Sequence, residues 1–96
     1  MSVTITIPTA LRQFTGGSSR IEVEATTAGE ALNRLTVVHA ELRRHLYNDQ
    51  DALRSFVNVY VNDEDIRYLE KDKTALGGGD VVSIVPSIAG GRAVWR

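Results

Sequence analysis

The sequence predicts an α+β domain in which a mixed sheet of four to five strands carries one main helix across one face. Three observations support this prediction. Residues 2–7 and 20–25 alternate polar with apolar side chains, which is typical of half-buried strands. Residues 28–46 place an apolar side chain at every third or fourth position, as one face of a helix does. Residues 81–85 are nearly all apolar, which predicts a central strand covered on both faces.

The first two predicted strands form a hairpin. Val3, Ile5 and Ile7 share one side of residues 2–7, and Pro8 then ends the hydrogen-bond ladder because proline lacks a backbone N–H. Apolar Leu11 and Phe14 fall in the loop that follows, and Gly16-Gly17-Ser18-Ser19 indicates a turn. Residues 20–25 then return as the antiparallel partner.

The helix has a recognisable start. Thr27 and Glu30 fit the capping box, in which Thr27 accepts from a free backbone N–H and Glu30 reaches back to the cap. The β-branched residues 36–38 lower the helix propensity in the middle of the segment 28–46, so the helix is expected to end near His39 or Ala40. A continuation or a second short helix would then reach Leu46. The apolar stripe of this segment consists of Ala28, Leu32, Leu35, Val38, Leu42 and Leu46.

The second half of the sequence predicts a series of short elements. Residues 56–61 are rich in β-formers and form a strand in which Val57, Val59 and Val61 share a face. The remaining predictions are a polar loop at 47–51, an acidic turn at 62–65, a short strand at 66–68, a helical turn at 74–76 and a tight reversal at 77–80. With the first and last strands side by side and parallel, this order gives the β-grasp arrangement.

The composition narrows the classes of function. The chain has 96 residues, 43% of them hydrophobic, and a net charge of −1, which fits one soluble domain with no basic surface for nucleic acid. It has no cysteine, which removes disulfides and thiolate chemistry. Neither a signal peptide nor an apolar run of membrane-spanning length is expected. A cytoplasmic protein that does not contact membranes is therefore predicted.

Several motifs that suggest a site have simpler explanations. Gly77-Gly78-Gly79 lacks the following lysine and helix start of a phosphate loop, so it predicts a turn. Asp63, Glu64 and Asp65 lack the spacing of a calcium loop and predict a solvated turn. His39 and His45 are six residues apart and would point to different sides of a helix. No metal site is predicted.

The end of the chain carries the clearest functional signal. Gly90-Gly91 is followed by only five residues, 92–96. Glycine has no Cβ, so such a segment can lie extended in a narrow channel with both faces of its carbonyl accessible. This suits chemistry at a C-terminal carboxylate, which here would first require cleavage of the Gly91–Arg92 bond.

Three segments carry a resemblance to a known family: residues 3–12, 56–67 and 79–91. The third is the most specific, because a buried strand, a proline and a diglycine follow one another. The chain resembles the ubiquitin-like sulfur carriers, which include the small molybdopterin synthase subunit and the thiamin sulfur carrier. It is most similar to the carriers of a cysteine-forming pathway in actinobacteria. The resemblance divides the chain into a carrier domain, 1–91, and a removable extension, 92–96.

The resemblance implies a protein that is a substrate of enzymes and not itself an enzyme, with no permanently bound cofactor. A ubiquitin-activating-like partner would use ATP and magnesium to adenylate Gly91, and sulfur from a donor would then give a thiocarboxylate for a downstream synthase. A JAMM-type zinc metallopeptidase would first cut between Gly91 and Arg92. Pro86, Ser87, Ile88 and Ala89 would thread the channel of the activating partner, with Gly90 as the steric companion of Gly91. Pro86 would also lower the ordering cost of binding.

Some roles stay open at this point. Tyr60 is either a partner contact on the sheet or part of the core. Trp95 either anchors the processing peptidase, packs back on the sheet or is an expression remnant. The product that receives the sulfur (cysteine, a cofactor or a secondary metabolite) is not encoded visibly. Two rival functions remain, a protein modifier attached to lysines through Gly91 and an interaction module with an uncut tail.

Overall fold

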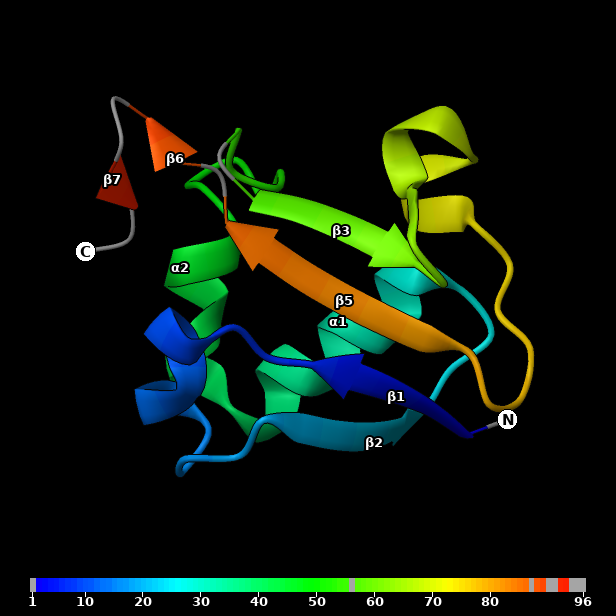
Figure 1. Cartoon of the computed structure of the whole chain (residues 1–96), viewed down its shortest axis with the longest axis horizontal. Helices are drawn as coiled ribbons and strands as arrows, with labels where there is room; N and C mark the ends of the chain where they lie inside the picture. Colours follow the sequence, from blue (N-terminus) through cyan, green and yellow to red (C-terminus); the bar gives the residue numbers. More distant parts are fainter. Residues whose placement is uncertain (1, 56, 87, 90–91, 94–96) are drawn as a thin grey trace.

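The computed structural model describes residues 2–55, 57–86, 88–89 and 92–93, and five strands in it form one mixed sheet (Figure 1). Across the sheet the order is β2-β1-β5-β3-β4. β1 runs parallel to β5, and the other neighbouring pairs are antiparallel. These strands are β1 (Ser2–Thr6), β2 (Arg20–Glu24), β3 (Val57–Val61), β4 (Glu64–Asp65) and β5 (Val81–Pro86). The predicted β-grasp arrangement is confirmed.

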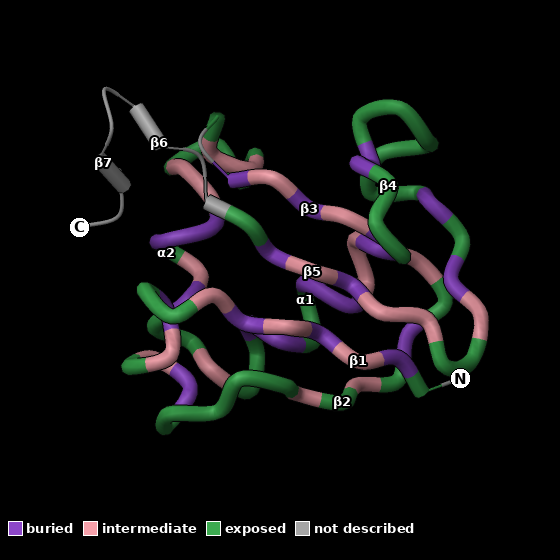
Figure 2. Tube along the Cα trace, viewed as in Figure 1, coloured by how far each residue is buried: buried purple, intermediate pink, exposed green. Residues whose placement is uncertain are grey.

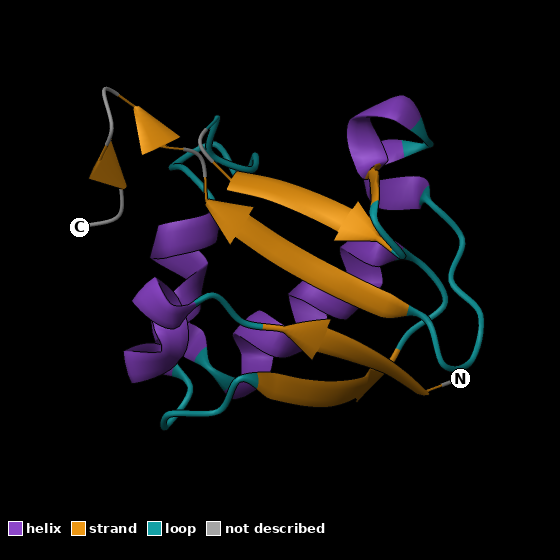
Figure 3. Cartoon of the chain, viewed as in Figure 1, coloured by secondary structure: helices purple, strands orange, loops and turns teal. Residues whose placement is uncertain are grey.

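Helix α1 (Ala28–Val38) crosses one face of the sheet (Figure 3). The Oγ1 of Thr27 accepts from the backbone N–H of Glu30 at 3.2 Å, as the capping box predicts. The Glu30 carboxylate, however, accepts from the N–H of Thr26 at 2.7 Å, one residue before the cap. This hydrogen bond holds the pKa of Glu30 below its ordinary value. The start of the helix is thus fixed by two side chains that bond to free backbone groups.

A second short helix follows α1, as predicted. A 3-10 turn, η2 (Ala40–Leu42), leads into α2 (Arg43–Leu46). Val38 was expected in the apolar stripe, but it is 69% exposed because the backbone leaves the helix at His39. Thr36 is buried on the helix instead. The other members of the stripe are buried: Ala28, Leu32, Leu35, Leu42 and Leu46.

Three predicted local structures differ from the observed ones. Residues 66–68 form a 3-10 turn, η3 (Ile66–Tyr68), and the expected strand lies earlier, as β4. The acidic turn therefore shortens to Asn62 and Asp63, whose positive φ values of 49° and 74° fit a two-residue hairpin loop. The helical turn expected at 74–76 lies at η4 (Lys71–Lys73). The loop after β1 contains a further 3-10 turn, η1 (Thr9–Phe14).

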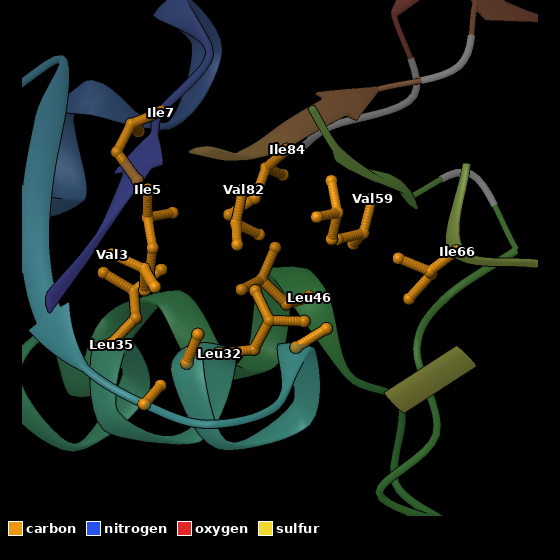
Figure 4. Close-up of a cluster of buried hydrophobic side chains, with 14 of the residues drawn as sticks. Val3, Ile5, Ile7, Leu32, Leu35, Leu46, Val59, Ile66, Val82 and Ile84 are labelled. Carbon is orange, nitrogen blue, oxygen red and sulfur yellow. The ribbon is translucent and has the colours of Figure 1, made fainter. Parts of the chain in front are cut away.

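The core lies between α1 and one face of the sheet (Figure 4). Val3, Ile5 and Ile7 are buried there, as their alternation predicts, beside Val82 and Ile84 of β5. β5 was expected to be covered on both faces, and this is wrong. Val85 is 41% exposed, because no helix among the described residues covers the second face of the sheet. Along β5, Figure 2 shows buried stretches that alternate with intermediate and exposed ones. Of the apolar run of residues 81–85, only Val82 and Ile84 are therefore buried in the core.

η1 and α2 meet at a buried histidine. Leu11 of η1 is fully buried, and the ring of Phe14 stacks on that of His45 with centroids 4.2 Å apart. His45 is 8% exposed, and its Nε2 has no hydrogen-bond partner among the described residues. Burial lowers the pKa of His45, and the charge of Arg44 lowers it further. His45 therefore belongs to the core in its neutral form.

We expect the free energy of unfolding to fall on mild acidification because of His45. Its pKa is below the ordinary 6.5 in the folded chain, so the unfolded chain binds the proton first and stability decreases as pH drops below 6.5. Denaturant unfolding between about pH 7.5 and 5.5 measures this slope. A His45→Leu variant should flatten it. An equally steep slope in that variant would assign the effect to other groups.

Gly29 allows η4 to pack closely on α1. A Cβ at this position would lie 2.9 Å from the backbone oxygen of Asp72, a separation that real Cβ atoms do not tolerate. The oxygen belongs to the main chain, so no side-chain rotation can relieve the contact. The contact therefore explains a glycine inside the first turn of a helix, where alanine would have the better intrinsic propensity.

A Gly29→Ala substitution should destabilise the protein by about 1 kcal/mol or more, because overpacking outweighs the gain in helix propensity. The matched control is Asn33→Ala at an exposed position of the same helix, which should gain about 0.5 kcal/mol. Thermal unfolding of both variants checks the difference. A higher melting temperature for Gly29→Ala would contradict the close contact.

Candidate functional site

The carboxyl end of β5 is where the tail leaves the sheet. Pro86 is the last residue of β5 and lies opposite Val57 of β3. Beyond it, β6 (Ile88–Ala89) pairs antiparallel with β7 (Arg92–Ala93), in the register Ile88 with Ala93 and Ala89 with Arg92. Figure 1 draws these two short strands beyond the end of β5, and they form a sheet of their own.

The structure places some of the predicted tail residues and not others. Ile88, Ala89 and Arg92 lie in the two short strands, on either side of the diglycine in the sequence. Ser87, Gly90, Gly91 and Trp95 lie outside the described residues. The β6–β7 pairing was not predicted from the sequence, although Gly-Gly between two short segments is a known hairpin signal. Residues on both sides of the diglycine thus pair with each other.

The face of the sheet opposite α1, here called the open face, presents a band of uncharged side chains. Thr6, Ser83 and Tyr60 form one row across β1, β5 and β3. Tyr60 is half-buried on this face, between the buried Val59 and Val61 in the sequence, so it belongs to the surface of the sheet and not to the core. The band consists of Thr4, Thr6, Asn58, Tyr60, Val81, Ser83 and Val85. Uncharged groups of this kind are less costly to desolvate than ions, which suits a docking surface.

Charged residues border this band on both sides. On one flank, the Arg67 guanidinium bonds Asp65 at 2.7 Å and the amide oxygen of Asn58 at 2.8 Å. The hydrogen bonds from Arg67 lower the pKa of Asp65, which is a buried carboxylate and not the solvated one predicted. On the other flank, Arg20, Glu22 and Glu24 are exposed along β2. The open face is therefore an uncharged strip between two charged margins.

The remaining sequence motifs form structural elements. The reversal at 77–80 is closed by Asp80, which accepts from the N–H of Gly77 at 2.7 Å and from the amide of Asn62 at 3.0 Å. These bonds lower the pKa of Asp80. Within the described part of the chain, no three metal-ligating side chains converge, and no helix is long and apolar enough to span a bilayer. The arrangement places an uncharged strip of the sheet beside the point where the diglycine segment leaves it at Pro86.

Comparisons with known proteins agree with this arrangement. The ThiS family matches residues 5–91. A sulfur carrier protein, CysO of Mycobacterium tuberculosis, is 39% identical over 93 residues, which cover 95% of this chain and all of the relative. The structure of the Amycolatopsis orientalis BexX/CysO complex superposes with a TM-score of 0.84 at 38% identity, over 93% of this chain and 99% of the other. Small archaeal modifier protein 3 of Haloferax volcanii is 35% identical over 72 residues, which cover 75% of this chain and 76% of the relative.

The family match spans every strand of the five-stranded sheet at least in part and extends to the second glycine of the diglycine. The first and last strands of the sheet, β1 and β5, lie side by side and parallel, and the helix lies on one face, as the sequence predicted. The chain therefore belongs to the ThiS family of ubiquitin-like sulfur carriers.

Proposed function

We propose that this protein carries sulfur as a thiocarboxylate on Gly91 for the biosynthesis of a small metabolite. The observation that supports this most directly is that the family match ends at Gly91, although five more residues follow. Residues 92–96 are then an extension that a partner peptidase removes. The sulfur carrier name of the Mycobacterium tuberculosis relative, which aligns along nearly the whole chain, supports the same role.

The proposed chemistry begins with hydrolysis of the Gly91–Arg92 bond, which frees a carboxylate on Gly91. That carboxylate attacks the α-phosphate of ATP in a partner enzyme, with magnesium, and releases pyrophosphate to give an acyl adenylate. A hydrosulfide ion from the sulfur donor then attacks the acyl carbon, AMP leaves, and the thiocarboxylate remains. The carrier contributes the reacting terminus and holds it in position. Binding of the carrier to the activating enzyme orients the Gly91 carboxylate toward ATP, so the reaction becomes effectively intramolecular.

The open face is the surface that we assign to this docking. Its uncharged band ends at Val85 and Asn58, next to the point where the tail leaves at Pro86. A partner seated there would hold Pro86, Ser87, Ile88 and Ala89 in its channel and Gly90 and Gly91 at its nucleotide. Glycine suits the last two positions because it adds no side chain to the reacting group. Tyr60 would contribute a large amphipathic contact of the kind that is enriched at interfaces.

A second candidate function is that of a protein modifier, in which Gly91 forms an isopeptide bond with lysine amines. The 35% identity to a small archaeal modifier protein supports this possibility. Both functions begin with the same adenylate, and they diverge in the nucleophile that attacks it. Intact masses of material produced together with the partner enzymes separate them, because sulfur replaces one oxygen in the first case and ladders of heavier adducts form in the second.

A chain that ends at Gly91 should be adenylated by the cognate activating enzyme without any peptidase, whereas the full-length chain should not. The reason is that Gly91 has no free carboxylate there, because its carbonyl is held in the peptide bond to Arg92. ATP–pyrophosphate exchange and intact mass spectrometry measure this difference. AMP found on the full-length chain would overturn the assignment of 92–96 as a removable extension.

A charge placed on the open face should impair activation. Val85→Glu introduces a carboxylate that docking would have to desolvate, so we expect kcat/KM for adenylation of the trimmed protein to drop about tenfold or more. Val38→Glu makes the same change at another exposed valine, at the end of α1 on the opposite side of the sheet, and should leave the rate unchanged. Equal rates for both variants would place the docking surface elsewhere.

A further inference from the structure

The two ends of the sheet carry different charges. We call the end at which β5 stops, at Pro86, the tail end, and the end at which it begins, at Val81, the far end. In Figure 1, α2 and the loop before β3 lie at the tail end, with η1 in blue beside α2. The turn between β3 and β4, together with η3 and η4, lies at the far end. Each end thus gathers side chains from separate parts of the chain.

Three arginines from three segments lie at the tail end. Arg20 is the first residue of β2 and stands opposite the last residue of β1. The Nε of Arg12 donates to the carbonyl of Ile7, directly after β1, at 3.1 Å. The carbonyl of Arg54 accepts from the N–H of Val57, at the start of β3, at 2.9 Å. None of the three arginines forms a salt bridge with a carboxylate of the described residues.

The other charged side chains of the tail end largely cancel. Arg43 bonds Asp51 at 3.0 Å, and Arg44 bonds Glu41 at 3.0 Å. Asp49 is the one carboxylate of the loop before β3 that has no salt bridge within the described part of the chain. The charge that remains for a partner at the tail end is therefore mainly positive.

The far end has the opposite excess. Asp63 and Glu64 are exposed at the turn between β3 and β4, and Asp80 directly precedes β5. Asp80 accepts from two uncharged groups, the N–H of Gly77 and the amide of Asn62, so it keeps its negative charge. Among the residues that the structure describes, these three carboxylates form no salt bridge.

The cations of the far end are balanced by nearby acids. Arg67 bonds the buried Asp65 at 2.7 Å, and acids alternate with lysines in residues 70–73. At the start of α1, the negative charge of Glu30 is countered by Arg34, one turn further along the helix. The domain therefore has a charge separation along β5, positive where the tail leaves and negative where the strand begins.

We propose that the tail end docks against carboxylates that surround the channel mouth of the partner that receives the tail, and that the opposite charges of the two ends orient the carrier tail-first as it approaches. This proposal rests on the proposed function, in which that partner is the activating enzyme. Attraction between the arginines and the acidic mouth raises the association rate, and repulsion of the far end disfavours the reversed approach.

A protein surface fits the three arginines better than other anions do. In the proposed docking, residues 87–91 lie extended in the channel and span up to about 17 Å. The arginines then surround the mouth of the channel, about that distance from the nucleotide phosphates at Gly91. A nucleic acid would be repelled by the carboxylates of the far end, and the chain as a whole has a net charge of −1.

The charge separation is tested on the full-length protein labelled with ¹⁵N, with hexaglutamate as a probe for an acidic surface. We expect NMR shifts of the Nε–H signals of Arg12, Arg20 and Arg54 that disappear at about 0.5 M salt, because screening shortens the reach of the charges. Hexalysine should instead shift the turn at Asp63 and Glu64. Equal shifts at both ends with either peptide would overturn the proposal.

The docking itself is tested with protein that ends at Gly91, which retains all five strands of the main sheet, and the cognate activating enzyme without ATP. At about 0.02 M salt, Arg20→Glu should lower the association rate constant about tenfold. Lys73→Glu makes the same change of charge at the far end and should not slow association. Arg20→Lys should retain the rate, because the effect depends on charge.

Equal association rates for Arg20→Glu and Lys73→Glu, a rate that salt does not change, or no association at all would each overturn the proposal. Adenylation is assayed in parallel to separate this failure from that of the proposed function. If the protein is adenylated while both reversals associate equally fast, only the electrostatic proposal is wrong. If association is fast and depends on Arg20 but no adenylate forms, the docking is confirmed and the sulfur-carrier chemistry is overturned.

Discussion

The parallel pairing of β1 with β5 is the interaction on which the rest of the structure depends. It joins the two ends of the domain, with Thr4 beside Val81 and Ile5 beside Val82. Closing so long a loop has an entropic cost, which grows only slowly with loop length. Burial of the apolar side chains of both strands against α1 offsets that cost. The pairing thus fixes the C-terminal strand in the middle of the sheet and lets the tail leave from a rigid element.

The two faces of β5 explain how so small a domain can be both stable and interactive. Val82 and Ile84 face α1 and belong to the core, while Val81, Ser83 and Val85 alternate with them on the open face. A two-layer architecture covers one face of the sheet and leaves the other to solvent or to a partner. The apolar residues left there are consistent with the docking role that we propose, since single apolar side chains gain free energy when a partner covers them.

Local polar interactions hold the side chains at the flank of the open face and at the start of α1. Arg67 ties Asp65 to Asn58 at the flank of the open face, and Glu30 and Thr27 hold the start of α1. The close contact between Gly29 and Asp72 sets how near η4, which carries Lys71 and Lys73, lies to α1.

The sequence by itself determined the elements whose signals are local and the family to which they belong. Alternation defined β1 and β2, the Thr27–Glu30 pair defined the start of α1, and residues 79–91 carried the family resemblance. Only the tertiary structure decided which apolar residues are exposed. Val38 and Val85 have the same side chain as the buried Val59, and their exposure depends on whether another layer lies over them. The pocket between α1, β3 and η3 was equally invisible, because its walls come from segments far apart in the chain that meet only after folding.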